Sequence, residues 1–251
     1  MPLTLLPGYR HGLKNILKSL LHRAGYSLIR DDLNWQSTSG SDHILKQVVG
    51  DSTIPPLIFD IGANNGRTTT RFKRLFPTAS IYAFEPVDTT FSELARNTGH
   101  LTDVRSYLLA IGSDEGVSRI YLRENNEWNS LVPQINDYLR EQNRPFVEVP
   151  RTTIDRFIET NSITHIDILK IDTEGYEVEV LKGARSAFDA GLIGAVYLEV
   201  GFDRTQLQHS FYLDILETMD RLGFRFRGFF EMSFEDGTRL DFANALFTRN
   251  A

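Results

Sequence analysis

The chain has no cysteine among its 251 residues, and this absence excludes whole classes of chemistry. Disulfide bonds, zinc-thiolate sites and catalysis by a thiol all require cysteine. An excess of basic residues is also lacking, because 33 acidic residues outnumber 27 basic ones and leave a formal net charge of −6. This balance argues against a nucleic-acid partner, since nucleic-acid phosphates select basic surfaces.

Long hydrophobic runs are absent as well. No apolar stretch approaches the roughly 20 residues that a membrane-spanning helix needs. The N-terminus also lacks the uninterrupted apolar segment of a signal peptide. We therefore expect a cytoplasmic protein without a transmembrane segment.

The N-terminal 50 residues carry a pattern of their own. Basic side chains alternate there with apolar ones, in the manner of an amphipathic helix. The basic set is Arg10, His11, Lys14, Lys18, His22 and Arg23, and the apolar set is Leu13, Ile16, Leu17, Leu20 and Leu21. We interpret residues 1–50 as a helical extension that caps the main domain or packs in a homodimer. Weak contact with a membrane surface is the alternative.

The segment from Leu57 to Gly66 predicts a ligand-binding turn. Its apolar run is too short for a helix and fits a strand that is covered on both faces. Asp60 comes near the end of this run, and Gly62 and Gly66 permit a sharp turn with close backbone approach to a ligand. A helix is expected to follow, so that its free N–H groups face the same crevice.

A second short strand ends in another acid about twenty residues downstream, in the order in which α/β folds bind nucleosides. The residues are Ser80 to Phe84, followed by Glu85 and Pro86. An acid at this strand tip is placed to accept hydrogen bonds from both hydroxyls of a ribose. Together the two strands predict a nucleoside site.

Strands and helices alternate along the remaining chain, which predicts an α/β domain over residues 51–251 with a mostly parallel sheet covered on both faces. We expect strands near 57–61, 80–84, 104–110, 166–171 and 194–200. We expect helices near 40–51, 67–76, 88–98, 152–161, 177–189 and 208–222. Two late strands at 224–231 and 242–248, with a turn at 235–237, predict an antiparallel edge.

The segment 116–151 breaks this alternation. It begins with an extended stretch at 117–123 and continues with a polar run that contains Trp128. A long polar insertion after the third strand suits a lid or a wall for the substrate, and an exposed variable loop is the alternative.

A second group of acids follows further on. Asp172 and Glu174 end the strand at 166–171, and Glu199 ends the next strand. In a parallel sheet these tips face the same edge as Asp60 and Glu85, where open sheets bind ligands. Carboxylates placed together repel each other unless a cation compensates. A sulfonium cofactor, a lysine or a metal ion would meet this requirement.

Lys170 lies two residues before Asp172, so both side chains point to the same side of their strand. Lys170 is therefore a candidate either to lower the pKa of a neighbouring acid or to act in catalysis. A buried structural ion pair is the alternative.

The residues quoted above resemble the FkbM family of S-adenosylmethionine-dependent methyltransferases. The resemblance spans roughly residues 55 to 200 and rests on four segments in the order and spacing of the family. They are Phe59 to Gly66, Phe84 to Pro86, Ala110 to Gly112 with Glu115 and Gly116, and Leu169 to Ala184.

The resemblance implies a class I methyltransferase fold, which is Rossmann-like with a seven-stranded sheet, and S-adenosylmethionine as the cofactor. It implies O-methylation of a hydroxyl on a sugar, a glycan or another natural product. The loop under the methionine part would contain Gly62, Ala63, Asn64 and Gly66, with Asp60 beside it. Glu85 would bind the ribose, and Ala110 and Ile111 would lie near the adenine.

Methyl transfer to a hydroxyl needs a base that removes the proton as the new bond forms. The candidates are Asp172, Glu174 and Glu199, with Lys170 as their catalytic neighbour. His209 is the alternative, although the helix predicted from Gln208 would equally place it on the surface.

A divalent cation such as Mg²⁺, held by Asp172 and Glu199, is possible but is not expected, because two carboxylates do not define a site.

Two other functions remain open from the residues. An NAD-dependent oxidoreductase would also place an acid at the second strand tip, but the turn from Gly62 to Gly66 is not a GxGxxG turn. A non-catalytic nucleoside-binding module of the same fold is the second alternative.

Overall fold

Four short apolar runs form the inner strands of the sheet, as their composition predicts. They are β1 (Leu57–Ile61), β2 (Ser80–Phe84), β7 (Ile166–Ile171) and β8 (Ile193–Gly201). The computed structural model that shows them describes residues 38–50, 54–123 and 129–249. Both faces of a central parallel sheet are covered, so these strands are almost continuously hydrophobic rather than alternating.

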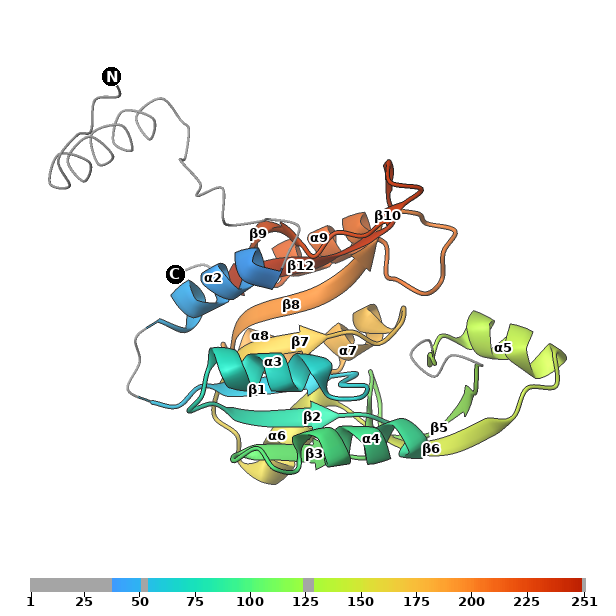
Figure 1. Cartoon of the computed structure of the whole chain (residues 1–251), viewed down its shortest axis with the longest axis horizontal. Helices are drawn as coiled ribbons and strands as arrows, with labels where there is room; N and C mark the ends of the chain where they lie inside the picture. The colour runs from blue at the N-terminus through green and yellow to red at the C-terminus, as the bar shows by residue number, and fades with distance from the viewer. Residues whose placement is uncertain (1–37, 51–53, 124–128, 250–251) are drawn as a thin grey trace, which may run out of the picture.

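The sheet has seven strands in the order β3-β2-β1-β7-β8-β12-β9 (Figure 1). Its outer strands are β3 (Val104–Tyr107), β12 (Phe242–Arg249) and β9 (Phe224–Phe230). The strands from β3 to β8 run parallel, whereas β12 is antiparallel to both β8 and β9. The prediction of a mostly parallel sheet with an antiparallel edge is confirmed.

Helices cover both faces of the sheet. Behind it in Figure 1 lie α6 (Ile154–Asn161), α7 (Glu177–Lys182), α8 (Arg185–Asp189) and α9 (Tyr212–Arg221), whose apolar side chains join the largest core cluster. In front lie α2 (Thr38–Val49), α3 (Arg67–Leu75) and α4 (Asp88–Thr98). The two layers bury the strands between them and leave the carboxyl ends of the strands open.

The predicted strand at 104–110 is in fact two strands, because the chain leaves the main sheet after β3 and enters a second one. Its short continuation β4 (Ala110–Ile111) pairs in parallel with β6 (Phe146–Thr152), which pairs antiparallel with β5 (Gly116–Tyr121). The second sheet and α5 (Pro133–Glu141) form most of the insertion and lie beyond the carboxyl ends of the parallel strands (Figure 1). The sequence did not predict β6 as a strand or α5 as a helix.

Two predicted helices differ from the observed ones. The helix expected at 177–189 is interrupted at Gly183, where a Cβ would lie only 1.9 Å from the carbonyl oxygen of Gly112. The helix expected from Gln208 begins only at Tyr212. Residues 207–209 form turns and a bend instead, and the Gly201 N–H donates to the Ser210 carbonyl at 2.9 Å. His209 therefore lies in a loop beside β8 rather than on a helix.

The predicted late turn is also present, between β10 (Phe234–Glu235) and β11 (Arg239–Leu240). No helix in the described ranges is both long and apolar enough to cross a membrane. The basic helix expected at the N-terminus lies outside the described residues.

Helix α2 packs on the front of the domain through apolar and charged contacts. Leu45 is completely buried in a cluster with side chains of β1, β2 and α3. Arg71 of α3 pairs with Asp42 at 2.6 Å and with Glu231 at 2.8 Å, and Ser41 also donates to Glu231. The described part of the N-terminal 50 residues is therefore an integral cap of the sheet. The domain boundary at residue 50 stays a prediction.

We predict that Leu45→Ala lowers the free energy of unfolding by about 2–5 kcal/mol, because it removes a fully buried side chain and leaves a cavity. Urea denaturation followed by circular dichroism measures this change. Lys46→Ala, at an exposed position of the same helix, is the matched control and should stay close to the unmodified protein. Equal stability of the Leu45 variant and the unmodified protein would show that α2 does not pack as described.

Candidate functional site

Acidic side chains gather at the carboxyl edge of the parallel sheet. Asp60 lies in β1, Glu85 follows β2, Asp172 follows β7 and Glu199 lies near the end of β8. Two neighbouring cavities open along this edge, and Asp172 and Glu174 belong to the walls of both. The predicted gathering of acids at one edge is therefore present.

The turn after β1 is held tightly between its neighbours. Gly62 has φ +73°, and a Cβ there would lie 1.8 Å from the carbonyl oxygen of Asp172. The N–H groups of Gly62 and Ala63 both donate to the carbonyl of Phe84, at 3.0 and 2.9 Å. Only glycine can occupy this position, because any side chain would separate the turn from β7.

The same turn fixes the acid at the tip of β2. Asn64 has φ +50°, and its N–H donates to Oε2 of Glu85 at 3.1 Å. The N–H of Val87 donates to Oε1 at 3.0 Å. Burial raises the pKa of Glu85 to about 7, although these two hydrogen bonds oppose the rise. A carboxylate has about four lone-pair sites, so Glu85 retains acceptor capacity for a ligand.

The first cavity extends from Glu85 to the tip of β7, and four of the predicted cofactor residues besides Glu85 line it. They are Gly62, Asn64, Ala110 and Ile111. Asn129 and Leu131 of the insertion also line it, so the insertion supplies part of a wall, whereas Trp128 lies outside the described residues. Ala63 and Gly66 line the neighbouring groove instead.

Asp60 is completely buried and lines neither cavity. Its Oδ2 accepts a hydrogen bond from the Thr69 hydroxyl of α3 at 2.6 Å. Burial raises the pKa of Asp60, and Lys170 and Thr69 only partly offset that rise. The structure therefore places this acid below the turn, where it ties β1 to α3.

Lys170 lies between two of the acids. It is opposite Asp60 in the β1–β7 register, and its Nζ is 3.8 Å from Oδ1 of Asp60 and 2.9 Å from Oδ2 of Asp172. Only 3% of the lysine side chain is exposed. Burial alone would lower the pKa of Lys170, but the charges of Asp172 and Asp60 outweigh it and raise the pKa above its usual value. Lys170 is therefore a buried cation that compensates two carboxylates.

The groove beside this first cavity contains the remaining predicted acids. Asp172, Glu174 and Glu199 line one side, and Arg67 and Arg74 of α3 also belong to its walls. The groove thus combines a carboxylate end, next to the first cavity, with basic side chains from the helix after the turn.

Glu174 lies in a constrained loop at the tip of β7. Its φ is +55°, and its backbone carbonyl accepts a hydrogen bond from the Ser130 hydroxyl at 2.6 Å. Burial, and then the charges of Asp172 and Glu199, raise the pKa of Glu174 to about 9. This carboxyl group is therefore protonated at neutral pH in the empty site.

Glu177 organises the loop around Glu174. It is 1% exposed, and its Oε1 accepts hydrogen bonds from Thr173 and from the N–H of Gly175. Its Oε2 accepts two more, from the N–H and the hydroxyl of Ser210. One buried carboxylate thus joins the tip of β7 to the loop that carries His209. The sequence analysis included Glu177 in the family segment but assigned it no role.

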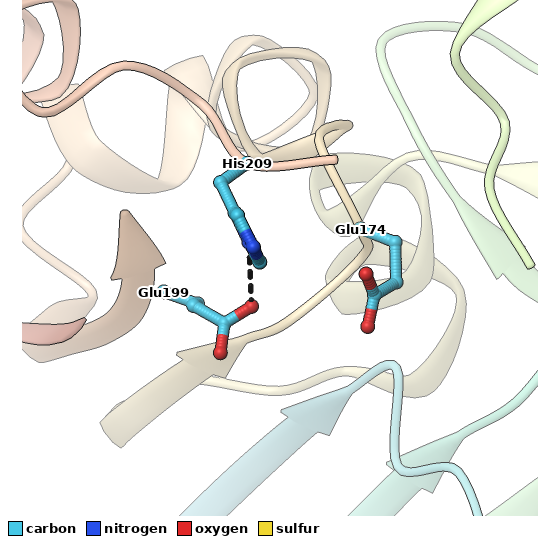
Figure 2. Close-up of side chains that lie close together, drawn as sticks. All are labelled: Glu174, Glu199 and His209. Carbon is cyan, nitrogen blue, oxygen red and sulfur yellow. Dashed lines mark ion pairs between the residues drawn. The ribbon is translucent and has the colours of Figure 1, made fainter. Parts of the chain in front are cut away.

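Glu199, which lines the groove, forms an ion pair with His209 (Figure 2). The Nδ1 atom of His209 is 3.0 Å from Oε2 of Glu199, which is an ion-pair distance, but the two groups are not aligned as a hydrogen bond. Burial and the charge of Asp172 raise the pKa of Glu199 to about 7, although His209 lowers it. Ligand-capable atoms of Glu174, Glu199 and His209 lie within 4.8 Å of one another. Asp172, which was paired with Glu199 as a possible metal ligand, is not part of this group.

Comparisons with known proteins show which family and which proteins the chain is similar to. The family model "Methyltransferase FkbM domain" matches residues 60–226. "Methyltransferase 1" of Beauveria bassiana is 29% identical over 143 residues, which cover 50% of this chain and 57% of that protein. "2-O-methyltransferase NoeI" of Sinorhizobium fredii is 26% identical, covering 66% and 72%. "Hexuronic acid methyltransferase AglP" of Haloferax volcanii is 21% identical, covering 65% and 64%.

The chain spans less than two thirds of the length of the two fungal methyltransferases that it matches. Among solved structures, a Burkholderia thailandensis N1-methyltransferase with bound S-adenosylhomocysteine superposes with a TM-score of 0.49 and 13% identity. That alignment covers 100% of this chain and 93% of the other.

We predict that Lys170→Met lowers the free energy of unfolding by about 3–5 kcal/mol, because it leaves the buried Asp60 and the partly exposed Asp172 without their cation. Chemical denaturation at pH 7 measures the loss. Lys182→Met is the control, since that lysine is 60% exposed and pairs only with Glu179 on its own helix. A variant at Lys170 that unfolds like the control would contradict the compensating role of this lysine.

Proposed function

The chain belongs to the FkbM methyltransferase family, and on this premise we propose that it transfers a methyl group from its cofactor, S-adenosylmethionine, to a hydroxyl group of a sugar, a glycan or another natural product. The class I methyltransferase fold that the family implies is the fold described above, with its antiparallel strand β12 inserted beside β8. The observation that carries the proposal is the position of the acids Asp172 and Glu174, which line both the first cavity and the groove.

The first cavity suits the adenosine part of the cofactor. Glu85 has free acceptor capacity toward the two ribose hydroxyls, and its orientation is set by the N–H groups of Asn64 and Val87. Ala110 and Ile111 supply an apolar surface for the adenine ring. In this arrangement the Gly62 turn lies under the methionine part, and the sulfur is close to the carboxyl edge of β7.

The charge of the site supports a cationic cofactor. Burial, and then repulsion by the charges of Asp172 and Glu199, raise the pKa of Glu174 to about 9. A sulfonium ion and an α-amino group both carry positive charge, and either one relieves this repulsion. S-adenosylmethionine brings both of them.

The groove is the proposed acceptor site. Its acids face a hydroxyl group, and Arg67 and Arg74 are suited to a carboxylate or phosphate carried by the same molecule. The similarity to a hexuronic acid methyltransferase agrees with an acidic sugar as one acceptor to be tested.

Of the three acids proposed as the base, Glu199 fits best. Asp172 is committed to Lys170 at 2.9 Å, and the pKa of Glu174, at about 9, keeps that group protonated. Glu199 lines the groove and has a pKa of about 7, which suits a group that must be ionised before reaction and accept a proton during it.

In the proposed reaction the acceptor oxygen attacks the methyl carbon in line with the sulfur. A carbon–oxygen bond forms, the carbon–sulfur bond breaks, and its electron pair remains on the sulfur of S-adenosylhomocysteine. The hydroxyl proton passes to Glu199 and then to solvent. Glu174, being protonated, is suited to donate a hydrogen bond to the acceptor or the cofactor.

The family match favours methyl transfer over an NAD-dependent oxidoreductase. Asp172, an acid that lines both cavities together with Gly62, would also repel the pyrophosphate of a dinucleotide placed there. Only a measurement of turnover distinguishes a methyltransferase from a non-catalytic nucleoside-binding module of the same fold.

The proposal is tested with S-adenosylmethionine that carries a ¹³C-labelled methyl group and a panel of glucuronic acid, galacturonic acid, neutral hexoses and an amino sugar. We expect a labelled methyl ether, identified by NMR and mass spectrometry, and its loss in Glu199→Gln. Label on nitrogen instead would overturn O-methylation. Tight cofactor binding without transfer to any acceptor would support the non-catalytic alternative.

We further predict that Glu85→Gln weakens binding of S-adenosylhomocysteine about 10- to 100-fold at pH 8, because a charged acceptor of the ribose hydroxyls is lost. The pKa of Glu85 is about 7 in the empty site, and ribose binding favours the carboxylate. Binding therefore releases a proton below pH 7, so affinity should rise with pH and level off above it.

Calorimetric titration between pH 6 and pH 8.5 measures both effects. The glutamine variant should show a weaker pH dependence, while Glu93→Gln, at an exposed position of α4, should behave like the unmodified protein. Unchanged affinity in the Glu85 variant would place the ribose elsewhere.

A further inference from the structure

We propose that His209 is a positioning residue that orients Glu199, so that the two side chains act as one proton-accepting pair. The inference rests on the proposed role of Glu199 as the base. It goes beyond that role because it assigns a function to His209, which lines neither cavity. His209 would act through Glu199 rather than on the acceptor.

The fold brings His209 to this place through three contacts. Its ring stacks on Phe242 of β12, with centroids 4.9 Å apart. Its Cβ lies so near Gly201 that a Cβ on that glycine would approach it to 2.7 Å. The next residue, Ser210, is fixed by two hydrogen bonds to Glu177. The imidazole ring is thus held in place by its own fixed backbone segment and by stacking on one of its faces.

The His209 ring lies where it can orient the Glu199 carboxylate. Nδ1 of His209 faces Oε2 of Glu199 at 3.0 Å, and only 13% and 12% of the two side chains are exposed. The pair is not yet aligned as a hydrogen bond, and such contacts often tighten only when substrate is bound. In Figure 2 the other carboxylate oxygen of Glu199 points away from the ring, and Glu199 belongs to the wall of the groove.

The charges around the ring favour its protonated form. The acids that face it come from every neighbouring element: Glu199 from β8, Glu177 from α7, and Asp172 and Glu174 from the tip of β7. Burial would lower the pKa of His209, but the interactions with Glu199, Glu177 and Asp172 outweigh it and raise the pKa above 6.5. A positive ring in turn lowers the pKa of Glu199, which burial and Asp172 raise.

The charged ring therefore determines the pH at which the base becomes available. With His209 in place, Glu199 ionises near pH 7. Without it, the carboxyl group keeps the effects of burial and of Asp172, and its pKa moves further up. The reaction then needs a higher pH.

The test compares His209→Gln with the unmodified protein over pH 5.5–9.5, with kcat/KM measured on an acceptor found by the labelled-methyl assay. We expect the acid limb of the profile to move to higher pH by about one unit, with a loss of about fivefold at pH 7 that is recovered at high pH. His165→Gln is the matched control, because His165 also pairs with a carboxylate, Asp167, at 3.3 Å.

The outcomes separate the alternatives. A profile of His209→Gln that superposes on the unmodified one overturns the proposal. Loss of activity at every pH would make His209 itself the base, and activity abolished by a chelator and restored by Mg²⁺ or Mn²⁺ would make the group a metal site. Both of these results also overturn it. S-adenosylhomocysteine affinity, measured in parallel, should be unchanged and shows that the variant is folded.

A second measurement does not depend on turnover. NMR titration of the imidazole protons, assigned through His209→Gln, should give His209 a pKa above 6.5 that falls in Glu199→Gln. An identical pKa in both proteins would overturn the pairing. Absence of methyl transfer by the unmodified protein would count against the proposed function, while this titration would still decide the pairing.

Discussion

The buried contact of Lys170 with Asp60 and Asp172 is the interaction on which the rest of the site depends. Lys170 and the two carboxyl groups meet where β1 and β7 lie side by side, and the lysine is almost completely removed from solvent. A buried carboxylate without a cation is costly, so the lysine allows two acids to remain at one sheet edge. Asp60 anchors α3 through Thr69, and Asp172 forms the wall of both cavities. The same ion pairs thus stabilise the fold and form the wall of the proposed site.

Lys170 compensates only part of the negative charge of the acids at this sheet edge. The remaining negative charge accounts for the proposed chemistry. Glu174, Glu199 and Glu85 all have raised pKa values, since burial and mutual repulsion disfavour their ionised forms. A cationic cofactor relieves this repulsion as it binds, and the acids then become available for hydrogen bonding or proton transfer. The methyl donor and the base would in this way be coupled through charge, because the donor is positive before transfer and neutral after it.

Much of the fold was predictable because the inner strands are short apolar runs that end in acids. The bounds of β1, β2 and β7 agree with the prediction, and so does the antiparallel edge. The insertion was predicted only in part, because β6 pairs with β5 residues that lie 25 to 35 positions away, and local pattern carries no signal of such pairing. His209 was placed on a helix because the segment before Tyr212 has helical composition. A tertiary contact, the bond from Gly201 to Ser210, overrides that preference. Asp60 was expected to contact the cofactor, but its depth in the sheet could not be read from its position in the motif.

The most direct test of the site is a crystal structure of the protein with S-adenosylhomocysteine. The account predicts that the ribose hydroxyls bond to Glu85, that the adenine lies against Ala110 and Ile111, and that the sulfur faces the acids at the tips of β7 and β8. A nucleoside bound elsewhere, or a sulfur directed away from Asp172 and Glu199, would contradict it.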